Sequence, residues 1–200
     1  MLPMLTVILV ALLAAHASAV TPVAAVNVTN YLGRWYQMYG DVFTQDTYGL
    51  GSVCATADYG FNSERNVSVH NAARLGHPNG ELYTVDGTAI QSEAHPGELS
   101  VAFSGGVIRG SYWIFELGPE TSSDDPVCAP TCYEYALISN EENLTLFAIT
   151  RNTTTFVNEY ESKFLATAQS LGFTKAWNKP VALYQGADCE YGPVPAASSA

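Results

Sequence analysis

The sequence is poor in positive charge. Only 8 Lys and Arg residues stand against 19 Asp and Glu residues, which gives a formal net charge of -11 at pH 7. Binding to a phosphate backbone or to an anionic membrane requires clustered cations. The composition therefore excludes nucleic acid as a partner, and the acidity is most simply a feature that keeps the protein soluble.

Long apolar runs are also absent beyond the N-terminus. Residues 1–19 are predicted to be a secretory signal peptide, with an apolar core from Leu5 to Ala15 and the small residues Ala17-Ser18-Ala19 at the cleavage site, although no Lys or Arg precedes the core. A membrane anchor is the weaker alternative, because the run is shorter than the about 20 residues that span a bilayer. We expect a secreted, extracellular protein without stable insertion in a membrane.

Residues that carry catalysis are scarce after this segment. The three remaining histidines, His70, His77 and His95, lack the His-x-x-x-His spacing of a metal site, and neither a Gly-x-Ser-x-Gly motif nor a phosphate-binding glycine loop is present. The acidic pairs Asp124-Asp125 and Glu141-Glu142 lie in polar turns, where solvation is expected. The sequence predicts no catalytic residue, no metal site and no cofactor.

The length suits one domain, because a single core of this size can bury about 70% of the surface of the unfolded chain. We assign residues 20–190 to this domain. Residues 191–200 are small residues and prolines apart from the first, and we expect them to form a disordered tail.

Most of the domain alternates apolar and polar residues with the period of two that is typical of half-buried strands. The alternation recurs in segments separated by turns, at 34–39, 52–61, 66–74, 81–91, 99–103, 112–117, 133–139 and 144–151, with a further short strand expected over 181–184. The eight main segments predict an all-β fold, an eight-stranded antiparallel up-and-down β-barrel, because closure leaves no sheet edge unpaired.

From Thr155 the period changes to that of a helix. Apolar side chains from Phe156 to Leu171 form one stripe while the charged ones face away, and Gly172 is placed to end the helix in a left-handed turn. The hydroxyls of Thr153–Thr155 are candidate N-caps. Because the polar face is not basic, binding along a membrane is disfavoured. We expect one C-terminal α-helix packed outside the barrel.

Two distant motifs give the chain a family resemblance. Gly33 and Trp35 stand at the start of the first predicted strand, and Arg151 ends the last one. This pattern resembles the lipocalin family, in which the arginine lies over the tryptophan ring and closes one end of the barrel. Segments 31–36, 85–89, 99–104 and 112–114 are similar to the apolipoprotein D-like branch. The resemblance covers Asn27 to Cys189 and implies an open cup that binds a small hydrophobic ligand.

The four cysteines allow three pairings, and disulfides are the default in a secreted chain. Cys128 and Cys132 are close enough in sequence to pair locally, which leaves Cys54 for Cys189, and the resemblance implies the same long link. That bridge closes a loop of 189 - 54 = 135 residues, for which chain entropy predicts a stabilisation of about 5 kcal/mol. The alternative is a free catalytic thiol at Cys54, as in the prostaglandin-isomerising lipocalin.

Alternate strand residues give a candidate ligand-binding lining, apolar with phenolic hydroxyls as polar groups. It comprises Ala57, Tyr59, Tyr83, Val85, Leu99, Val101, Phe103, Trp113 and Phe115, and the alternative is that these side chains simply fill the core. Arg65, Arg74 and Arg109 lie near predicted rims and are expected in solvent. Because a buried carboxylate without a partner is costly, we favour a neutral ligand such as a sterol, retinoid, carotenoid or other isoprenoid over a fatty acid.

Residues 118–132 depart from the resemblance. They form an acidic insert rich in Pro and Ser, with the Cys-x-x-x-Cys pair at its base. A protein partner at this insert is therefore a further hypothesis.

Four Asn-x-Ser/Thr sequons fit a secreted protein and predict a glycoprotein. They start at Asn27, Asn66, Asn143 and Asn152.

Three functions are consistent with these features. The first is a secreted carrier that holds a small hydrophobic molecule in the barrel. The second is a lipocalin-fold enzyme that acts on a lipid or carotenoid. The third is an extracellular interaction protein whose barrel is a filled scaffold and whose 118–132 insert binds the partner.

Overall fold

A computed structural model describes residues 20–47, 49, 51–103, 109–125, 127–128 and 130–195. The predicted signal peptide, residues 1–19, lies outside the described residues, as do the last five residues of the predicted tail. Within the described part, no helix is long and apolar enough to cross a membrane.

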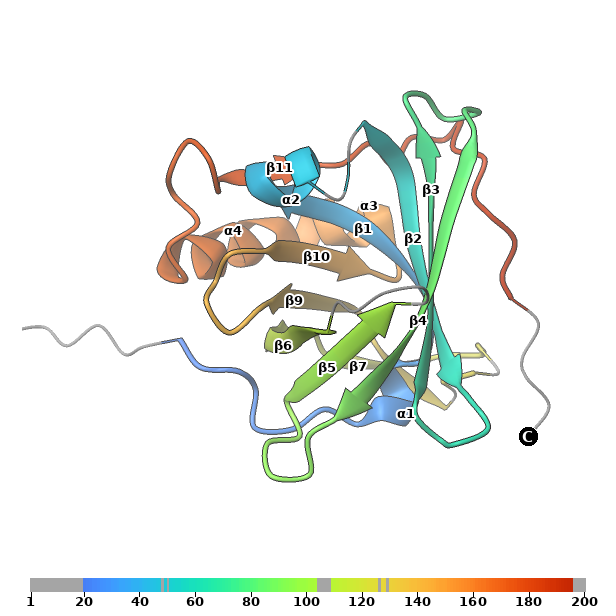
Figure 1. Cartoon of the computed structure of the whole chain (residues 1–200), viewed down its shortest axis with the longest axis vertical. Helices are drawn as coiled ribbons and strands as arrows, with labels where there is room; N and C mark the ends of the chain where they lie inside the picture. Colours follow the sequence, from blue (N-terminus) through green and yellow to red (C-terminus); the bar gives the residue numbers. More distant parts are fainter. Residues whose placement is uncertain are drawn as a thin grey trace, which may run out of the picture.

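The chain forms a closed antiparallel β-barrel of eight strands, as predicted (Figure 1). Neighbouring strands follow the order β10-β9-β6-β5-β4-β3-β2-β1, and β10 pairs with β1 to close the barrel. A short ninth strand, β11 (Pro180–Ala182), pairs with the end of β1. The barrel strands are β1 (Gly33–Asp41), β2 (Ser52–Phe61), β3 (Val67–Leu75), β4 (Leu82–Gln91), β5 (Glu98–Phe103), β6 (Arg109–Leu117), β9 (Tyr135–Ser139) and β10 (Leu146–Thr150).

The two ends of the barrel differ. At one end, called here the closed end, α1 (Val28–Tyr31) precedes β1, and the 118–132 insert forms a separate two-stranded sheet of β7 (Glu120–Ser122) and β8 (Thr131–Tyr133). The opposite, open end carries the β3–β4 turn and α2 (Val42–Thr47), which follows β1. Figure 1 shows α1 at the bottom of the barrel and the β3–β4 turn at the top.

The predicted helix lies outside the barrel, beside β9 and β10 (Figure 1). It begins with α3 (Thr153–Thr155), continues through one wider π-helical stretch, η1 (Phe156–Tyr160), and ends with α4 (Glu161–Ser170). Its N-cap is Asn152, whose Oδ1 accepts a hydrogen bond from the Thr155 amide, so the threonine hydroxyls do not serve as the cap. Gly172 follows with φ of +92°, the left-handed conformation predicted for it.

Two apolar clusters account for the core. One fills the barrel interior around Trp35, and the other lies between the outer face of the sheet and the helix, where Phe156 and Phe164 are fully buried. The part of the sheet under the helix is therefore buried on both faces, which removes the simple alternation of inward apolar and outward polar residues there.

Both predicted disulfides are present. Cys54 is bonded to Cys189 and Cys128 to Cys132, so all four cysteines of the chain are used. The alternative of a free thiol at Cys54 is therefore wrong.

The segment after Cys189 runs along the outer face of the sheet. The Tyr191 ring meets the Tyr36 ring edge-on at 5.0 Å between centroids, and Gly192 is buried near Ala72 and Leu82. Residues 193–195, still within the expected disordered tail, are exposed.

Candidate ligand-binding cavity

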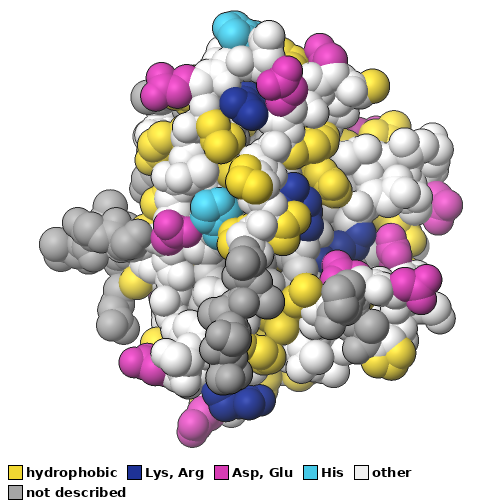
Figure 2. Space-filling view, turned by 90° about the vertical axis from the view of Figure 1, so that its right-hand side faces the viewer, with side chains coloured by type: hydrophobic (Ala, Val, Ile, Leu, Met, Phe, Trp, Pro, Cys, Tyr) yellow, Lys and Arg dark blue, Asp and Glu magenta, His cyan; other side chains and the backbone are white. Residues whose placement is uncertain are grey.

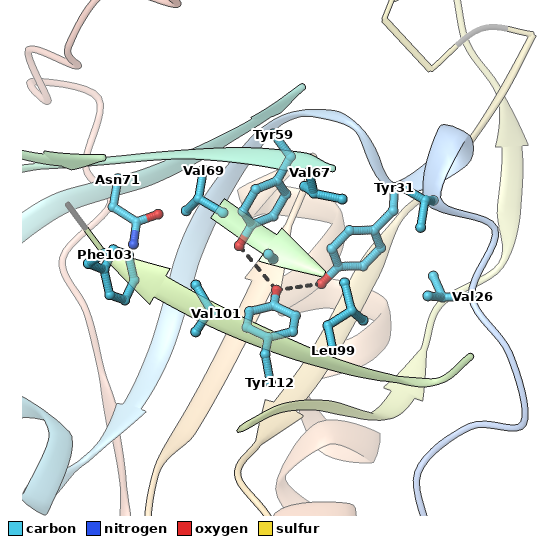
Figure 3. A pocket seen from close by; sticks show the side chains of 12 residues that line it. Val26, Tyr31, Tyr59, Val67, Val69, Asn71, Leu99, Val101, Phe103 and Tyr112 are labelled. Atoms are coloured by element: carbon cyan, nitrogen blue, oxygen red, sulfur yellow. Dashed lines mark hydrogen bonds between the residues drawn. The ribbon is translucent and has the colours of Figure 1, made fainter. Parts of the chain in front are cut away.

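An apolar cavity lies inside the barrel, beside α1 of the closed end (Figure 3). Its volume is about 40 Å³, small beside the ~300–1,000 Å³ typical of pockets for drug-sized ligands. A larger ligand therefore requires lining side chains to move. The cavity is lined by Val26, Val28, Tyr31, Tyr59, Val67, Val69, Asn71, Ala89, Leu99, Val101, Phe103 and Tyr112.

Three phenols supply most of the polarity in this lining, and we call them the tyrosine triad: Tyr31, Tyr59 and Tyr112. They come from α1, β2 and β6, and their hydroxyls converge inside the cavity (Figure 3). The Tyr112 hydroxyl lies 2.8 Å from that of Tyr31 and 3.1 Å from that of Tyr59.

The environment keeps the triad neutral. Burial raises the pKa of Tyr59 to about 12 and raises the pKa values of Tyr31 and Tyr112 well above the usual value. Desolvation is the dominant cause, because a phenolate in an apolar interior lacks the stabilisation that water provides. The hydroxyls therefore act at neutral pH as hydrogen-bond donors and acceptors without charge.

Asn71 adds a second polar group. It lies on β3 near Phe103, on the side of the cavity away from Val26 (Figure 3). Its Oδ1 atom is buried and has no hydrogen-bond partner within the described part of the chain. A buried polar atom of this kind is uncommon, because leaving it unpaired costs free energy.

The closed end of the barrel is held by Arg151. Its Cζ atom lies 3.8 Å from the centre of the Trp35 ring, and Trp35 is fully buried. The guanidinium also donates to the carbonyl oxygens of Arg34 at 2.8 Å and Leu32 at 2.5 Å. Burial lowers the pKa of Arg151 to about 10, still far above neutral pH, so the side chain remains a cation.

This arrangement agrees with comparisons to known proteins. A family model described as a lipocalin-like domain matches residues 26–180, most of the chain. The chain belongs to the lipocalin family. Among curated relatives, the Outer membrane lipoprotein Blc of Vibrio cholerae is 28% identical over 156 residues, covering 78% of this lipocalin and 81% of the relative.

A second curated relative is the Lazarillo protein of Schistocerca americana. It is 38% identical over 90 residues, which is 44% of this lipocalin and 40% of the relative. This match therefore spans less than half of the Lazarillo protein.

Solved structures share the fold at low sequence identity. Lobster apocrustacyanin A1 is 19% identical with a TM-score of 0.59, and the match covers 82% of this lipocalin and 83% of that chain. Japanin from Rhipicephalus appendiculatus, in a structure with bound cholesterol, is 14% identical with a TM-score of 0.52, covering 82% and 99% of the two chains.

The structure places the nine predicted lining residues of this lipocalin in four groups. Four of them line the cavity: Tyr59, Leu99, Val101 and Phe103. Ala57 belongs to the same interior cluster, next to Trp35 in the β1–β2 pair. Val85 and Tyr83 lie farther along β4 toward the open end, and Tyr83 is 53% exposed.

The remaining two, Trp113 and Phe115, do not face the cavity. They belong to the outer cluster under the helix, and the inward row of β6 is formed by Tyr112 and Ile114. Both rows of β6 are apolar because both faces of the sheet are covered here. Periodicity separates two such rows but does not show which one faces inward.

Sequence reasoning missed several lining residues. Tyr31 lies in a helical turn before the first strand, where a period of two carries no information. Val67 and Val69 alternate on β3, so their shared face was detectable. The other missed residues are Val26, Val28, Asn71, Ala89 and Tyr112.

Proposed function

We propose that this lipocalin is a secreted binding and transport protein that holds a small hydrophobic molecule in the barrel cavity. The supporting observation is the apolar cavity itself, enclosed by a barrel whose closed end is fixed by Arg151 over Trp35. Burial of apolar ligand surface supplies the affinity, at about 25 cal/mol per Å² before the cost of association.

A neutral ligand fits this cavity best. Its lining contains neither Lys nor Arg, and a carboxylate buried without a cationic partner is unfavourable. We favour a sterol, retinoid, carotenoid or other isoprenoid over a fatty acid. The cholesterol bound to japanin supports a sterol as one member of this class.

The first test is native mass spectrometry of the deglycosylated protein purified from its own secretion, together with organic extraction. We expect a stoichiometric apolar molecule to co-purify. An empty protein that also fails to bind a panel of retinoids, sterols and fatty acids would contradict the proposal.

A matched pair of variants locates the site. Val101 lines the cavity, whereas its neighbour Ser100 lies on the outer face of β5. Val101→Phe should fill the cavity and lower the amount of co-purifying ligand at least about tenfold, because a mismatched side chain in a packed interior is costly. Ser100→Phe should leave it unchanged. Equal ligand content in both variants would place the ligand elsewhere.

We also propose that the sequons carry glycans, as expected for a secreted protein. Asn27 and Asn152 are exposed, and each uses Oδ1 to cap a helix, accepting from the Thr29 and Thr155 amides. Attachment at Nδ2 would leave both caps intact. Peptide mapping after enzymatic deglycosylation in heavy-oxygen water should label these two asparagines; absence of label at both would contradict the assignment.

Within the family, we propose a place in the apolipoprotein D-like branch. Its support is the set of motifs around Gly33, Val85, Leu99 and Tyr112. The two curated relatives do not distinguish this branch from others.

The second candidate function is recognition of a protein partner by the insert. The insert is an independent β7–β8 sheet, stapled by Cys128–Cys132, with exposed Glu120 and Asp124 side chains. Deleting the insert should then abolish partner binding while ligand binding persists. A catalytic function has less support, because the disulfides occupy every thiol in the chain.

A further inference from the structure

We propose that the cavity selects a neutral ligand with a hydrogen-bond-accepting oxygen, such as a ketone or an ether, and that the tyrosine triad donates to this oxygen. The inference rests on the proposed function and narrows its ligand class. General hydrophobic binding needs only the valine, leucine and phenylalanine walls, so it leaves the three hydroxyls unexplained.

The tyrosine triad has more hydrogen-bond donors than its own contacts use. Three hydroxyls carry three O–H donors, and the two contacts at 2.8 Å and 3.1 Å use one donor each. No other protein partner of these hydroxyls is found among the described residues. One O–H donor is therefore left over, whichever way the chain of hydrogen bonds runs. An oxygen of the ligand, lying between the apolar walls, would satisfy it.

The energetic cost of this arrangement argues against a purely structural purpose. The Tyr31 and Tyr59 rings stack at 5.6 Å between centroids, and phenylalanine rings could pack in the same way. Hydroxyls buried without full hydrogen bonding cost about 1–3 kcal/mol per unpaired group. A ligand oxygen that completes the network recovers this free energy on binding.

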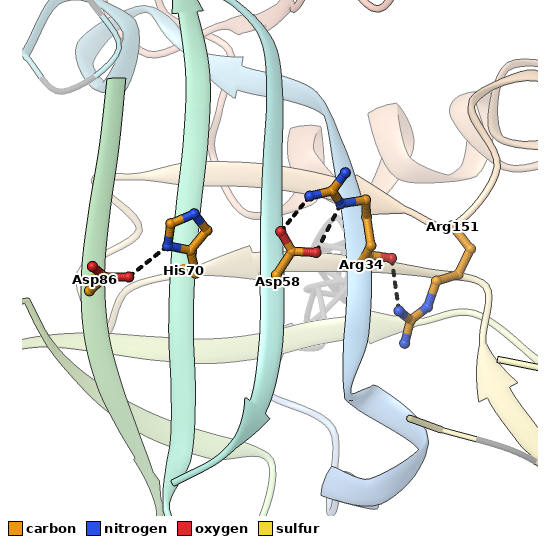
Figure 4. Close-up of polar contacts among 5 residues, drawn as sticks. All are labelled: Arg34, Asp58, His70, Asp86 and Arg151. Atoms are coloured by element: carbon orange, nitrogen blue, oxygen red, sulfur yellow. Dashed lines mark hydrogen bonds and ion pairs between the residues drawn. The ribbon is translucent and has the colours of Figure 1, made fainter. Parts of the chain in front are cut away.

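The neighbouring charges favour a neutral oxygen over a carboxylate. Arg151 lies at the closed end, but its donors are already directed at carbonyl oxygens: Nη1 at Arg34, Nη2 at Leu32 and Asn30, and Nε at Tyr133. Arg34 forms a bidentate ion pair with Asp58, at 2.7 and 2.9 Å (Figure 4). Arg151 is thus engaged at the closed end and Arg34 on the outer face of the sheet, and neither belongs to the lining of the cavity.

Asn71 provides a second polar contact for the same ligand. Asn71 is the next inward-facing residue after Val69 on β3, and Val69 pairs with Tyr59 across the sheet. That step is ~7 Å along the strand. A ligand that also carries a hydroxyl about this far from its acceptor oxygen could pair with the unpartnered Oδ1 atom of Asn71.

The experiment compares two probes of nearly the same shape, acetophenone and α-methylstyrene, in which a C=O replaces a C=CH₂. Dissociation constants are measured by NMR titration for the wild-type protein and for the combined variant Tyr31→Phe, Tyr59→Phe and Tyr112→Phe. The control is Tyr83→Phe, the same substitution at an exposed tyrosine outside the cavity. Thermal unfolding checks that each variant is folded.

We expect the combined variant to lose about five- to tenfold in affinity for acetophenone while its affinity for α-methylstyrene stays the same or rises, as for loss of one hydrogen bond. Tyr83→Phe should change neither. Equal changes in affinity for both probes would overturn the inference but not the proposed hydrophobic binding. Failure of the wild-type protein to bind either probe would count against both the inference and the proposed function.

A second measurement needs no variant. The carbonyl carbon of ¹³C-labelled acetophenone bound to the wild-type protein should resonate downfield of its position in cyclohexane, because a donated hydrogen bond polarises the carbonyl. A bound resonance at the cyclohexane position would overturn the inference even if the combined variant does not fold.

Discussion

Arg151 shows how one side chain can fix an end of a barrel. It is a half-buried cation whose charge is offset by the face of the Trp35 ring and by four carbonyl oxygens, which come from α1, the residue after it, β1 and β8. Each charge-assisted hydrogen bond makes only a modest net contribution to stability, but removing the guanidinium leaves several carbonyl groups without partners at once.

For this residue we predict that Arg151→Met lowers the free energy of unfolding by about 3–5 kcal/mol, the cost of breaking a partly buried charged network. Urea denaturation followed by tryptophan fluorescence measures this. Arg65→Met is the control, because Arg65 is exposed and its guanidinium lies 5.6 Å from the centre of the Phe61 ring, and it should change stability by less than about 1 kcal/mol. Similar losses in the two variants would contradict the assignment.

A cross-strand row on the outside of the sheet also consists of paired polar side chains. Arg34, Asp58, His70 and Asp86 are direct neighbours across β1, β2, β3 and β4, and they form two pairs, Arg34 with Asp58 and His70 with Asp86 (Figure 4). Figure 2 shows this side of the molecule, with acidic and basic side chains scattered among apolar ones and no large basic patch on the visible face. Because one pair joins β1 to β2 and the other joins β3 to β4, the row supports the pairing of these strands.

At the scale of elements, the helix is held on the barrel by apolar packing and by several polar contacts, among them the Tyr39 hydroxyl, which donates to Glu161 at 2.8 Å. Glu116 of β6 is buried and pairs with Lys163 of α4 at 2.8 Å, and the Tyr135 hydroxyl donates to the same carboxylate. Burial alone would raise the pKa of Glu116, but hydrogen bonds from Lys163, Thr167 and Tyr135 hold this pKa below its usual value.

This shift predicts a pH dependence of helix docking. A carboxyl whose pKa is lower in the folded than in the unfolded state stabilises the fold above the unfolded value, near 4.5, and this contribution is lost as pH falls through the folded value. Glu116→Gln should therefore reduce the loss of unfolding free energy between pH 6 and pH 3. Chemical denaturation at both pH values measures the difference, and Glu159→Gln, on the exposed side of η1, is the control. An unchanged pH dependence in Glu116→Gln would contradict the prediction.

At the scale of the whole molecule, the two disulfides constrain very different lengths of chain. Cys54–Cys189 closes a loop of 135 residues and ties the C-terminal segment to β2, whereas Cys128–Cys132 closes a loop of 4 residues within the insert. Each bridge stabilises the fold by removing entropy from the unfolded chain. This stabilisation is about 5 kcal/mol for Cys54–Cys189 and about 2 kcal/mol for Cys128–Cys132.

We therefore predict a larger loss of stability when the long bridge is removed. Replacing Cys54 and Cys189 together by alanine should lower the midpoint of thermal unfolding by well over twice as much as replacing Cys128 and Cys132, in scanning calorimetry of both double variants. Equal shifts would show that the two bridges stabilise the native state through local packing instead.

The barrel, the outer helix and both disulfides could be predicted from the residues themselves, whereas the contact of Arg151 with Trp35 was predicted from the resemblance to the lipocalin family. The first three follow from local signals, namely a period of two, a change to a helical period, and the short spacing of Cys128 and Cys132, which leaves Cys54 for Cys189. Which row of β6 faces inward depends on the tertiary structure. The helix covers Trp113 and Phe115, so these two side chains lie in apolar surroundings just as Tyr112 and Ile114 do inside the barrel. The tertiary structure also decided that Tyr31, Tyr59 and Tyr112 meet, since they come from three elements far apart in sequence, and such convergence depends on how the strands close around one another.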